Sequence, residues 1–581
     1  MNDIGSGWYS YTLSFTNTTV NFKFNIGVAY QSSNITGIST SSCWVSTDAD
    51  GAPSVAYTTI SADCPNNMYY RSVASGDWNS TTSWEQSVDN ATWVAASSVP
   101  SSSANGVLIS TNNTVTVSSG VTSPSSASFI VNGTLSFTAS SATVSTAPTY
   151  SCGSTLKYAL GTGNSRSVGT EWTANATSLG AGCPQNVEVT SGRLKMTNAS
   201  FANKYYAIGN LSVKNGAIFD MDVRYDSDVA NHQGKVVVTF TGDITIDTGG
   251  KIEYAGENTT LAGNLAFQCH TMTNNGTLSL SNNTDNTRYL QSIGGDLYLT
   301  GDFIENNTFN CNGRALIFIG TENQKIDGSS NSPFAVDFMA VVKTSGTVTM
   351  YKDVTCKGYS SSGGGWWALN MTGGSLNLNG HSLIVSAADG SGTIGSSGIN
   401  CSGTAKIVGS ATSSISLLGN RSSWTANNNH IVLDQTTPGI TNSLKDLIIN
   451  RTDSASLTDK VYVNTVYIYN SLQIKASEVT IDAVTLDSAA IASISSTVST
   501  AKLNVNGNLI FTRSLNSSSE FYPNGRTLNI GGTVQTKVHF ARLGKWHFIS
   551  FPYDVTIKKS DNSTSATIGT SSSDGDLAVY W

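Results

Sequence analysis

Short runs in which apolar and polar residues alternate recur along most of the chain, and turns that contain glycine separate them. A typical run is Thr114-Val-Thr-Val117, in which every second side chain is apolar. Alternation with a period of two predicts a strand with one buried face, because successive side chains of a strand point to opposite sides. The pattern therefore predicts an all-β protein made of many short strands.

A loose internal repeat introduces many of these strands: Asn or Thr, then Gly, then an alternating run. It occurs at residues 131–137, 214–219, 275–280, 346–350, 374–380, 506–511 and 524–530. Asn-Gly permits a positive φ at a tight turn, and the run that follows reads as a short strand with one buried face. Each repeat thus predicts one turn and one strand.

Such strands fit either tandem β-sandwiches or a β-solenoid, and three observations favour the solenoid. Charged residues make up only 12% of the 581 residues, which suits stacked coils because like charges in register repel. The abundant Asn, Ser and Thr side chains can form polar ladders along the coil axis. The repeats show no period of about 100 residues, the length of a sandwich domain. We expect coils of about 20–30 residues.

Differences in composition divide the chain into four segments. Residues 1–66 carry an aromatic-rich β pattern, and residues 67–120 form a tryptophan-rich entry. Residues 121–540 carry the solenoid repeats, and residues 541–581 look like the start of a further, incomplete β domain. The predicted fold is an all-β, elongated β-solenoid shaft flanked by small β-sandwich-like segments. We interpret Trp78, Trp84 and Trp93 as a cap, since a terminal coil must cover core that no neighbour buries.

Charge and hydropathy exclude two classes of partner. The net charge is -7, and the 31 Lys and Arg residues form no basic run, whereas nucleic acid binding needs clustered cations. No stretch approaches 18 consecutive apolar residues, so we expect no membrane span. The sequence opens without a secretory signal, so export predicts that this chain is a mature or shortened segment of a longer one.

Cysteine usage indicates an oxidising compartment. The eight cysteines are widely spaced without a C-x-x-C pair, at Cys43, Cys64, Cys152, Cys183, Cys269, Cys311, Cys356 and Cys401. An even number with such spacing is typical of disulfides in an exported protein. Pairing of sequence neighbours is the simplest connectivity, and buried free thiols are the alternative.

Three stretches resemble large secreted proteins of Bacteroidetes-type bacteria. Tyr70-Arg-Ser-Val-Ala-Ser-Gly-Asp-Trp78 and the residues up to Val117 look like the tryptophan-rich entry to their adhesin-like β-solenoids. The run from Asn323 to Leu383 is similar to the solenoid body, and Trp546–Val555 looks like the start of their C-terminal β-domain. The resemblance implies an extracellular or cell-surface protein, and it specifies architecture rather than activity.

The N-terminal stretch more weakly resembles the second half of a starch-binding (family-26 carbohydrate-binding) module. The matching residues are Gly7-Trp-Tyr-Ser-Tyr11, Val20-Asn-Phe-Lys-Phe-Asn25, Gln31 and Trp44. The first half of such a module is absent. The resemblance implies glycan binding by stacking on Trp8, Tyr9, Tyr11 and Trp44. Ordinary cross-strand aromatic packing is the alternative.

An acidic run offers the sharpest chemical candidate. On one strand, Asp220, Asp222, Asp226 and Asp228 fall on one face with Arg224. Carboxylate clusters on solenoids are typical of calcium-dependent polysaccharide lyases and of pectin hydrolases, so this run is a candidate Ca²⁺ site. The alternative, which we favour, is a solvated outer strand. No catalytic residue is assigned, since no H-E-x-x-H, G-x-S-x-G or P-loop motif occurs.

Sequons for N-linked sugar are frequent, only slightly above what this composition produces by chance. Candidate glycosylation sites include Asn17, Asn79, Asn132, Asn275, Asn370 and Asn450. Ser/Thr-rich outer strands could equally carry O-linked sugar.

The favoured hypothesis is a non-enzymatic extracellular structural or adhesive protein, a rod-like segment of a bacterial surface adhesin or fibre. Its partners would be further domains of a longer chain, glycans, or copies of itself joined head-to-tail into filaments. The alternative is a carbohydrate-active enzyme, a solenoid lyase or hydrolase, or the carbohydrate-binding appendage of one.

Overall fold

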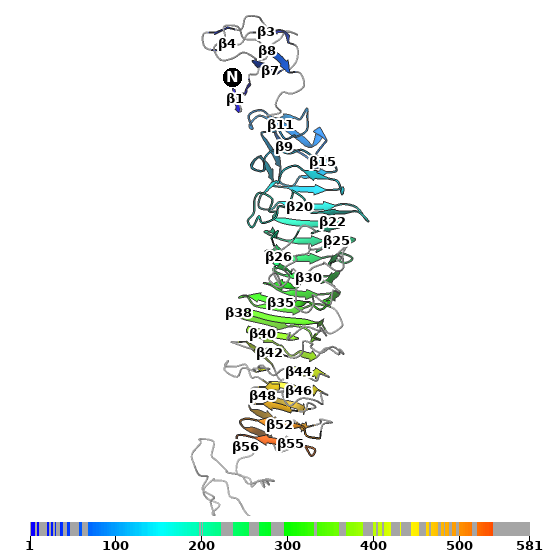
Figure 1. Cartoon of the computed structure of the whole chain (residues 1–581), viewed down its shortest axis with the longest axis vertical. Helices are drawn as coiled ribbons and strands as arrows, with labels where there is room; N and C mark the ends of the chain where they lie inside the picture. The colour runs from blue at the N-terminus through cyan, green and yellow to red at the C-terminus, as the bar shows by residue number, and fades with distance from the viewer. Residues whose placement is uncertain are drawn as a thin grey trace, which may run out of the picture.

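The computed structural model describes residues 68–196, 202–221, 236–254, 266–280, 295–329, 334–358 and 368–386, and shorter stretches between 399 and 538. Before residue 68 it describes only the backbone of eight short strands. Two single-turn 3-10 segments, η1 (Thr81–Ser83) and η2 (Ser126–Ser128), are the only helical elements in these residues. The predicted all-β solenoid is therefore confirmed, and Figure 1 shows its coils stacked along one long axis.

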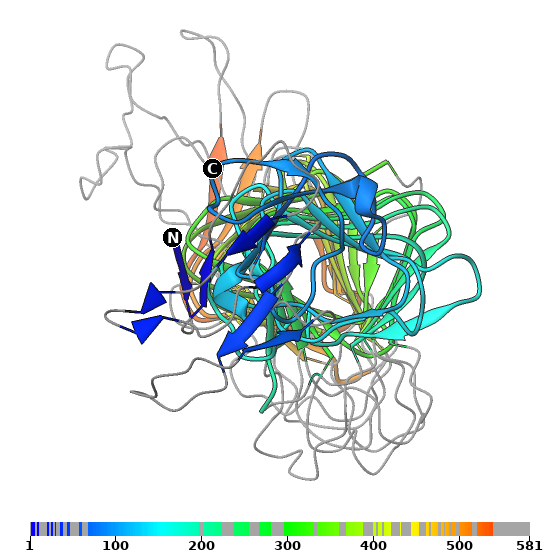
Figure 2. The same ribbon diagram turned by 90° about the horizontal axis from the view of Figure 1, so that it is seen from above.

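Each coil consists of three short strands joined by corners. In one coil these are β26 (Val236–Phe240), β27 (Ile244–Ile246) and β28 (Lys251–Glu253). The next coil repeats them as β29 (Ala266–Cys269), β30 (Met272–Asn274) and β31 (Thr277–Ser279). Every strand pairs in parallel with its equivalent one coil further on. The stack therefore has three walls, which enclose the core when viewed along the axis in Figure 2.

The second wall runs through the most coils without a break. Its strands are β10 (Gly76–Asp77), β14 (Thr114–Val117), β17 (Thr134–Phe137), β20 (Thr155–Ala159), β22 (Asn186–Lys195), β24 (Leu211–Val213), β27, β30, β33 (Phe303–Glu305), β36 (Gln324–Asp327), β38 (Phe338–Met350), β40 (Leu369–Asn377) and β43 (Lys406–Val408). From β14 onward, paired residues on this wall are between 20 positions apart, for Val115 and Leu135, and 33 apart, for Leu211 and Ile244; Gly76 and Val115, in the first pair of strands, are 39 apart. The predicted coil length is close to this range.

The first wall consists of two series of strands. The earlier series is β9 (Tyr69–Ser72), β13 (Gly106–Ile109), β16 (Phe129–Val131) and β19 (Thr149–Tyr150). The later series is β23 (Tyr205–Ala207), β26, β29, β32 (Leu297–Leu299), β35 (Ala315–Gly320), the first halves of β38 and β40, and β42 (Ile399–Cys401).

The third wall is also divided. It begins with β15 (Gly120–Val121) and β18 (Thr143–Val144). A second series is β21 (Ser165–Ser167), the second half of β22, β25 (Ala217–Asp220), β28, β31 and β34 (Thr308–Asn310). Later coils continue with β37 (Phe334–Val336), β39 (Val354–Cys356), β41 (Ser382–Ser386) and β44 (Ser414–Gly419).

The coils nearest the C-terminal end of the described rod lie in two further sheets. One continues from β44 through β46 (Ser443–Arg451), β48 (Val466–Ile474), β50 (Val484–Leu486), β53 (Leu509–Arg513) and β56 (Val534–Val538), with β51 (Ile491–Ile494) and β54 (Glu520–Tyr522) alongside. The other contains β45 (His430–Ile431), β47 (Val461–Val463), β49 (Glu478–Ile481), β52 (Lys502–Val505) and β55 (Thr527–Ile530).

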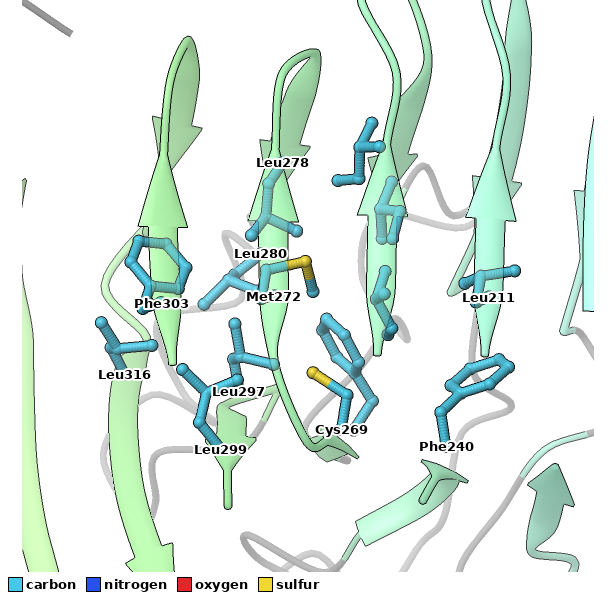
Figure 3. Packing of buried hydrophobic residues seen from close by; sticks show 14 of the residues in the cluster. Leu211, Phe240, Cys269, Met272, Leu278, Leu280, Leu297, Leu299, Phe303 and Leu316 are labelled. Atoms are coloured by element: carbon cyan, nitrogen blue, oxygen red, sulfur yellow. The ribbon is translucent and has the colours of Figure 1, made fainter. Parts of the chain in front are cut away.

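Apolar side chains stack in columns inside the walls. Leu211, Ile244, Met272 and Phe303 occupy one position in four successive coils. All four are almost fully buried, and Figure 3 shows three of them among their neighbours. Because each coil covers the apolar face of the next, the core is one column along the axis and depends on nearest-neighbour contacts.

A ladder of polar side chains holds one corner of these coils in register. In each step a side-chain oxygen accepts a hydrogen bond from a backbone N–H of the next coil. The steps are Asn186 Oδ1 to Asn210 N (3.1 Å), Asn210 Oδ1 to Asp243 N (2.8 Å), Asp243 Oδ1 to Thr271 N (3.1 Å), Thr271 Oγ1 to Asp302 N (3.2 Å) and Asp302 Oδ1 to Lys325 N (2.9 Å). Short polar residues therefore stack as the sequence predicts.

The glycines of the Asn-Gly repeat have two different roles. Gly216 and Gly525 have φ of 76° and 71°, as predicted for a tight turn. Gly133 and Gly276 lack this conformation. A Cβ atom at Gly133 would lie 2.3 Å from the carbonyl oxygen of Ser110, and one at Gly276 would lie 2.3 Å from that of Gly250. At these two corners glycine is required because the coils approach closely.

The two ends of the described rod differ. At the N-terminal end, β11 (Trp84–Ser87) pairs antiparallel with both β9 and β12 (Val94–Ala95). Trp78 and Trp84 lie edge to face, 5.3 Å apart, and each is 1% exposed. In the coil nearest the other end, Leu528 and Ile530 are only partly buried, whereas their partners Leu503 and Val505 one coil earlier are buried.

The predicted flanking segments are described less fully. Before residue 68 the strands form antiparallel pairs, β1 (Asn2–Gly5) with β2 (Trp8–Ser10), β3 (Val20–Phe22) with β6 (Ile35–Ile38), β4 (Asn25–Ile26) with β5 (Ala29–Tyr30), and β7 (Cys43–Ser46) with β8 (Tyr57–Ile60). Their side chains and residues 539–581 lie outside the described residues.

Candidate functional site

The cysteines correct the disulfide prediction. Cys152, Cys183, Cys269, Cys311 and Cys356 are free thiols, so neither the 152–183 nor the 269–311 pair forms. Cys152 is exposed, while the Cys183 thiol is buried and points to the carbonyl oxygen of Tyr206 at 3.3 Å. Burial raises the pKa of the Cys183 thiol to about 11. The side chains of Cys43, Cys64 and Cys401 lie outside the described residues.

The buried thiols fill core columns as small apolar groups would. Cys269 is paired with Leu299 in the next coil. Cys356 stands between Val336 and Val385 in the preceding and following coils. Free cysteine packs as a small hydrophobic residue, which is the physical reason that the even number of cysteines misled the prediction.

The candidate sugar-binding aromatics are only partly placed. Trp8 and Tyr9 lie on β2, and Trp44 lies on β7. The side chains of these three residues and of Tyr11 lie outside the described residues. Glycan binding by Trp8, Tyr9, Tyr11 and Trp44 therefore stays a prediction.

The acidic run begins on the outer face of the third wall, where β25 ends at Asp220. Asp220 is buried, and Arg193 of the preceding coil binds it through Nη1 at 2.5 Å. Nη2 of Arg193 binds Glu253 of the following coil at 2.6 Å. Burial disfavours the charged guanidinium, but the bonds to Asp220 and Glu253 outweigh this and raise the pKa of Arg193. We call these three residues the outer ion ladder.

In the outer ion ladder, the Asp220 carboxylate forms an ion pair between two coils. Asp222, Asp226 and Asp228 lie outside the described residues, as does Arg224. Within the part of the chain that is described, no three His, Cys, Asp or Glu side chains gather as a metal site requires. Calcium binding by the whole acidic run stays a prediction.

The glycosylation candidates differ in their surroundings. Asn79 is exposed just after β10, whereas Asn132 and Asn275 lie half-buried in coil corners. Oδ1 of Asn275 accepts a hydrogen bond from Nδ2 of Asn306 at 2.7 Å. Asn370 lies on β40, and the side chains of Asn17 and Asn450 lie outside the described residues.

The structure reveals a buried ion pair that the sequence analysis did not single out. Nη2 of Arg166, on β21, lies 2.7 Å from Oε1 of Glu171, and the two side chains are 3% and 0% exposed. The same Oε1 accepts hydrogen bonds from the hydroxyl of Tyr158 at 2.9 Å and the backbone N–H of Gly169 at 3.0 Å. We call Arg166, Glu171, Tyr158 and Tyr150 the inner polar cluster.

Aromatic rings of two coils enclose the inner polar cluster. The guanidinium of Arg166 stacks 4.3 Å from the ring centre of Phe137. The Tyr150 hydroxyl donates to the backbone oxygen of Glu171 at 2.8 Å. Burial, and then the negative charge of Glu171, raise the pKa values of Tyr150 and Tyr158 well above the ordinary value. Nε of Arg166 and Oε2 of Glu171 are buried and have no hydrogen-bond partner among the described residues.

One signal in the sequence marks this pair. Between Lys157 and Glu188, Arg166 and Glu171 are the only charged residues. The position of Arg166 on its strand could not be predicted, because its neighbours Ser165 and Ser167 are both exposed serines that give no apolar alternation. Arg166 pairs with Leu194 in the next coil and so occupies an inward position that elsewhere is apolar.

A further buried carboxylate lies between the first and third walls. Asp296 is 2% exposed, and its Oδ1 accepts a hydrogen bond from the backbone N–H of Ala315 at 2.8 Å. Burial raises the pKa of Asp296 to about 7, although this hydrogen bond and the charge of Arg314 oppose the shift. Arg314 is 1% exposed.

Comparisons with known proteins identify no relative: no family model, curated protein or solved structure matches this chain. Among the described residues, no helix is long and apolar enough to cross a membrane.

Proposed function

We propose that this chain is a rod-like segment of an extracellular bacterial surface adhesin or fibre, with the solenoid as a spacer and without enzymatic activity. The observation that carries the proposal is the second wall, whose parallel pairing runs unbroken from β10 to β43. Such pairing satisfies backbone groups coil by coil. A structure of this kind holds its two ends at a fixed separation, which is what a spacer does.

The surface chemistry supports an extracellular rod. With 31 Lys and Arg among 581 residues, proteases that cleave after basic residues have few targets. Several of these cations are paired with carboxylates, as in Lys157 with Glu188 at 3.4 Å and Lys214 with Asp247 at 3.2 Å. The free thiols remove the disulfide argument for the cysteines described, so export rests on composition and on the adhesin resemblance.

Head-to-tail association of copies is the second part of the proposal. Of the seven large exposed apolar side chains among the described residues, five lie toward the two ends of the described rod and two, Val342 and Tyr351, lie in its middle. Those toward the ends are Val73, Val88 and Val94 at one end and Ile491 and Tyr522 at the other. The edge strands β12 and β56 each pair on one side only among the described residues. Unpaired strand edges beside apolar side chains favour strand addition by a neighbour.

Small-angle scattering and electron microscopy of the chain at several concentrations test the proposal. We expect an elongated particle at low concentration and end-to-end chains at higher concentration. A compact particle would contradict the spacer role, and a monodisperse rod at all micromolar concentrations would contradict self-association alone.

Incubation with pectin, alginate and starch separates this proposal from the carbohydrate-active alternative. We expect no new reducing ends and no unsaturated products. Release of either would overturn the non-enzymatic assignment. Binding of malto-oligosaccharides without cleavage, followed by tryptophan fluorescence, would instead support a carbohydrate-binding appendage.

A further inference from the structure

Parallel pairing between coils is interrupted at two successive coil interfaces, in a different wall at each. In the first wall, β19 has no parallel partner in the next coil among the described residues, and Thr149 makes a single antiparallel bridge to Ala181. In the third wall, β15 and β18 form a sheet of their own, and among the described residues β18 does not pair with β21. Among the described residues, the second wall pairs across both interfaces, through β17, β20 and β22. Each interface is crossed by one other wall, through β16 with β19 at the first and β21 with β22 at the second.

The segment between the interrupted strands has an irregular path. Residues 160–184 contain the short β21 and then turns, with Gly180 at φ 147° and Gly182 at φ 68°. The backbone N–H of Gly182 donates to the oxygen of Pro148 at 2.8 Å, and that of Ile208 donates to the oxygen of Pro184 at 3.0 Å. These single bonds replace the ladder that other coils make in the first wall.

The core of the coil between these two interfaces is the inner polar cluster. On the side of the preceding coil, Phe137 stacks on Tyr158 of the cluster, with 5.8 Å between the ring centres. On the side of the following coils, the ring centre of Trp172 lies 5.9 Å from the ring centres of both Tyr205 and Phe240. Where the adjacent coils pack apolar side chains, this coil thus contains a buried ion pair, two of whose polar atoms have no hydrogen-bond partner among the described residues. A buried pair of charges stabilises a core less than apolar side chains of the same volume.

We propose that residues 160–184 form a joint, a coil that opens locally while the coils on either side stay folded. Two independent observations carry this: the loss of parallel pairing in two walls, and a core that is polar where its neighbours are apolar. The joint divides the rod into an earlier section, with coils of 20 to 21 residues between Val115, Leu135 and Leu156, and a later section that begins near β23. This inference does not depend on the proposed function.

Hydrogen exchange of the unmodified chain, read by mass spectrometry of its peptides, tests the joint. We expect amides of 160–184 to exchange at least tenfold faster than those of β17 and of β24 in native buffer, in a local opening. Equal protection in all three regions, or loss of protection that advances only from the ends of the rod, would overturn the proposal.

A double variant tests the cause. Arg166→Met with Glu171→Leu replaces the pair by apolar groups of similar size, and we expect exchange in 160–184 to slow by tenfold or more. The matched control is Lys157→Met with Glu188→Leu on the outer face of the second wall, which should leave exchange in 160–184 unchanged. If the inner double variant accelerates exchange there, the polar core is not the weak element and the proposal fails. Circular dichroism confirms that both variants keep their strands.

Discussion

The inner polar cluster and the outer ion ladder are made of the same kinds of residue on neighbouring strands, yet their surroundings are opposite. Arg166 on β21 points inward and Arg193 on β22 points outward. The outer guanidinium binds two carboxylates from two coils and remains 26% exposed. The inner guanidinium binds a single carboxylate oxygen, and its Nε has no hydrogen-bond partner among the residues that the structure describes. Inward or outward direction on a strand, more than residue type, thus decides whether a charge strengthens or weakens a coil.

The largest effect should follow loss of one inner charge. Glu171→Leu leaves the Arg166 guanidinium buried without its carboxylate, and we expect a loss of about 3–5 kcal/mol in the free energy of unfolding. Urea unfolding followed by circular dichroism measures it. Adding Arg166→Met should recover most of the loss. A loss below about 1 kcal/mol in the single variant would show that the pair is not effectively buried.

Asp296 extends the comparison to a buried carboxylate with a raised pKa. Because its folded pKa is near 7 and its unfolded pKa is near 4, its contribution to stability is present below about pH 4 and is lost as pH rises to about 7. Asp296→Asn removes this dependence. Relative to the wild type, we expect the free energy of unfolding of the variant to rise by up to about 4 kcal/mol between pH 4 and pH 8. Parallel stability curves would contradict the raised pKa.

In the outer ion ladder, the loss of stability should be larger for the variant that affects the more deeply buried carboxylate. Arg193→Met leaves the buried Asp220 without its guanidinium, and we expect a loss of about 2–3 kcal/mol. Glu253→Gln removes the partly exposed arm of the ladder, so its effect should stay below about 1 kcal/mol. Thermal unfolding of both variants with the wild type gives the order. The reverse order would mean that Asp220 is stabilised mainly by other contacts.

The smallest effect belongs to the corner ladder. Asp243→Ala removes the oxygen that accepts the backbone N–H of Thr271, and the expected loss is about 1 kcal/mol. Asn210→Asp keeps the side-chain oxygen that accepts the backbone N–H of Asp243, and this variant serves as the control. Hydrogen exchange at Thr271 and its neighbours reports the local effect. An unchanged exchange rate there would mean that the hydrogen bond from Thr271 to Asp243 does not stabilise the corner.

The fold was predictable because the alternating pattern repeats so often that one misjudged strand changes little. In Thr114–Val117 the alternation shows every buried position, and in Thr134–Phe137 it shows the buried apolar positions but not the buried Ser136. Single positions were harder. Arg166 lies between two serines and gives no sign of pointing inward. The run that predicted a strand from Asp220 onward meets the end of β25 at that residue, and Met221 is buried outside any strand.

The candidate sites were predicted less well than the fold for a physical reason. A pattern of period two identifies the face of a strand but not which strand of the next coil pairs with it. The contact between Arg193, Asp220 and Glu253 therefore depends on coil lengths of 25 and 33 residues. Those lengths vary from coil to coil and leave no fixed spacing in the sequence. The disulfide prediction was wrong for a similar reason. The number of cysteines suggested pairs, whereas the described buried cysteines lie in apolar columns.

The parallel ladders also determine how the rod would respond to tension along its axis. Each coil is held to the next by hydrogen bonds that lie along the axis, so a pull at the two ends loads one coil interface at a time instead of shearing whole strands. A coil of 20 to 33 residues that detaches releases roughly 70–110 Å of extended chain, against a rise of about 4.8 Å per stacked coil. A tether built this way would lengthen in discrete steps and absorb work before it broke.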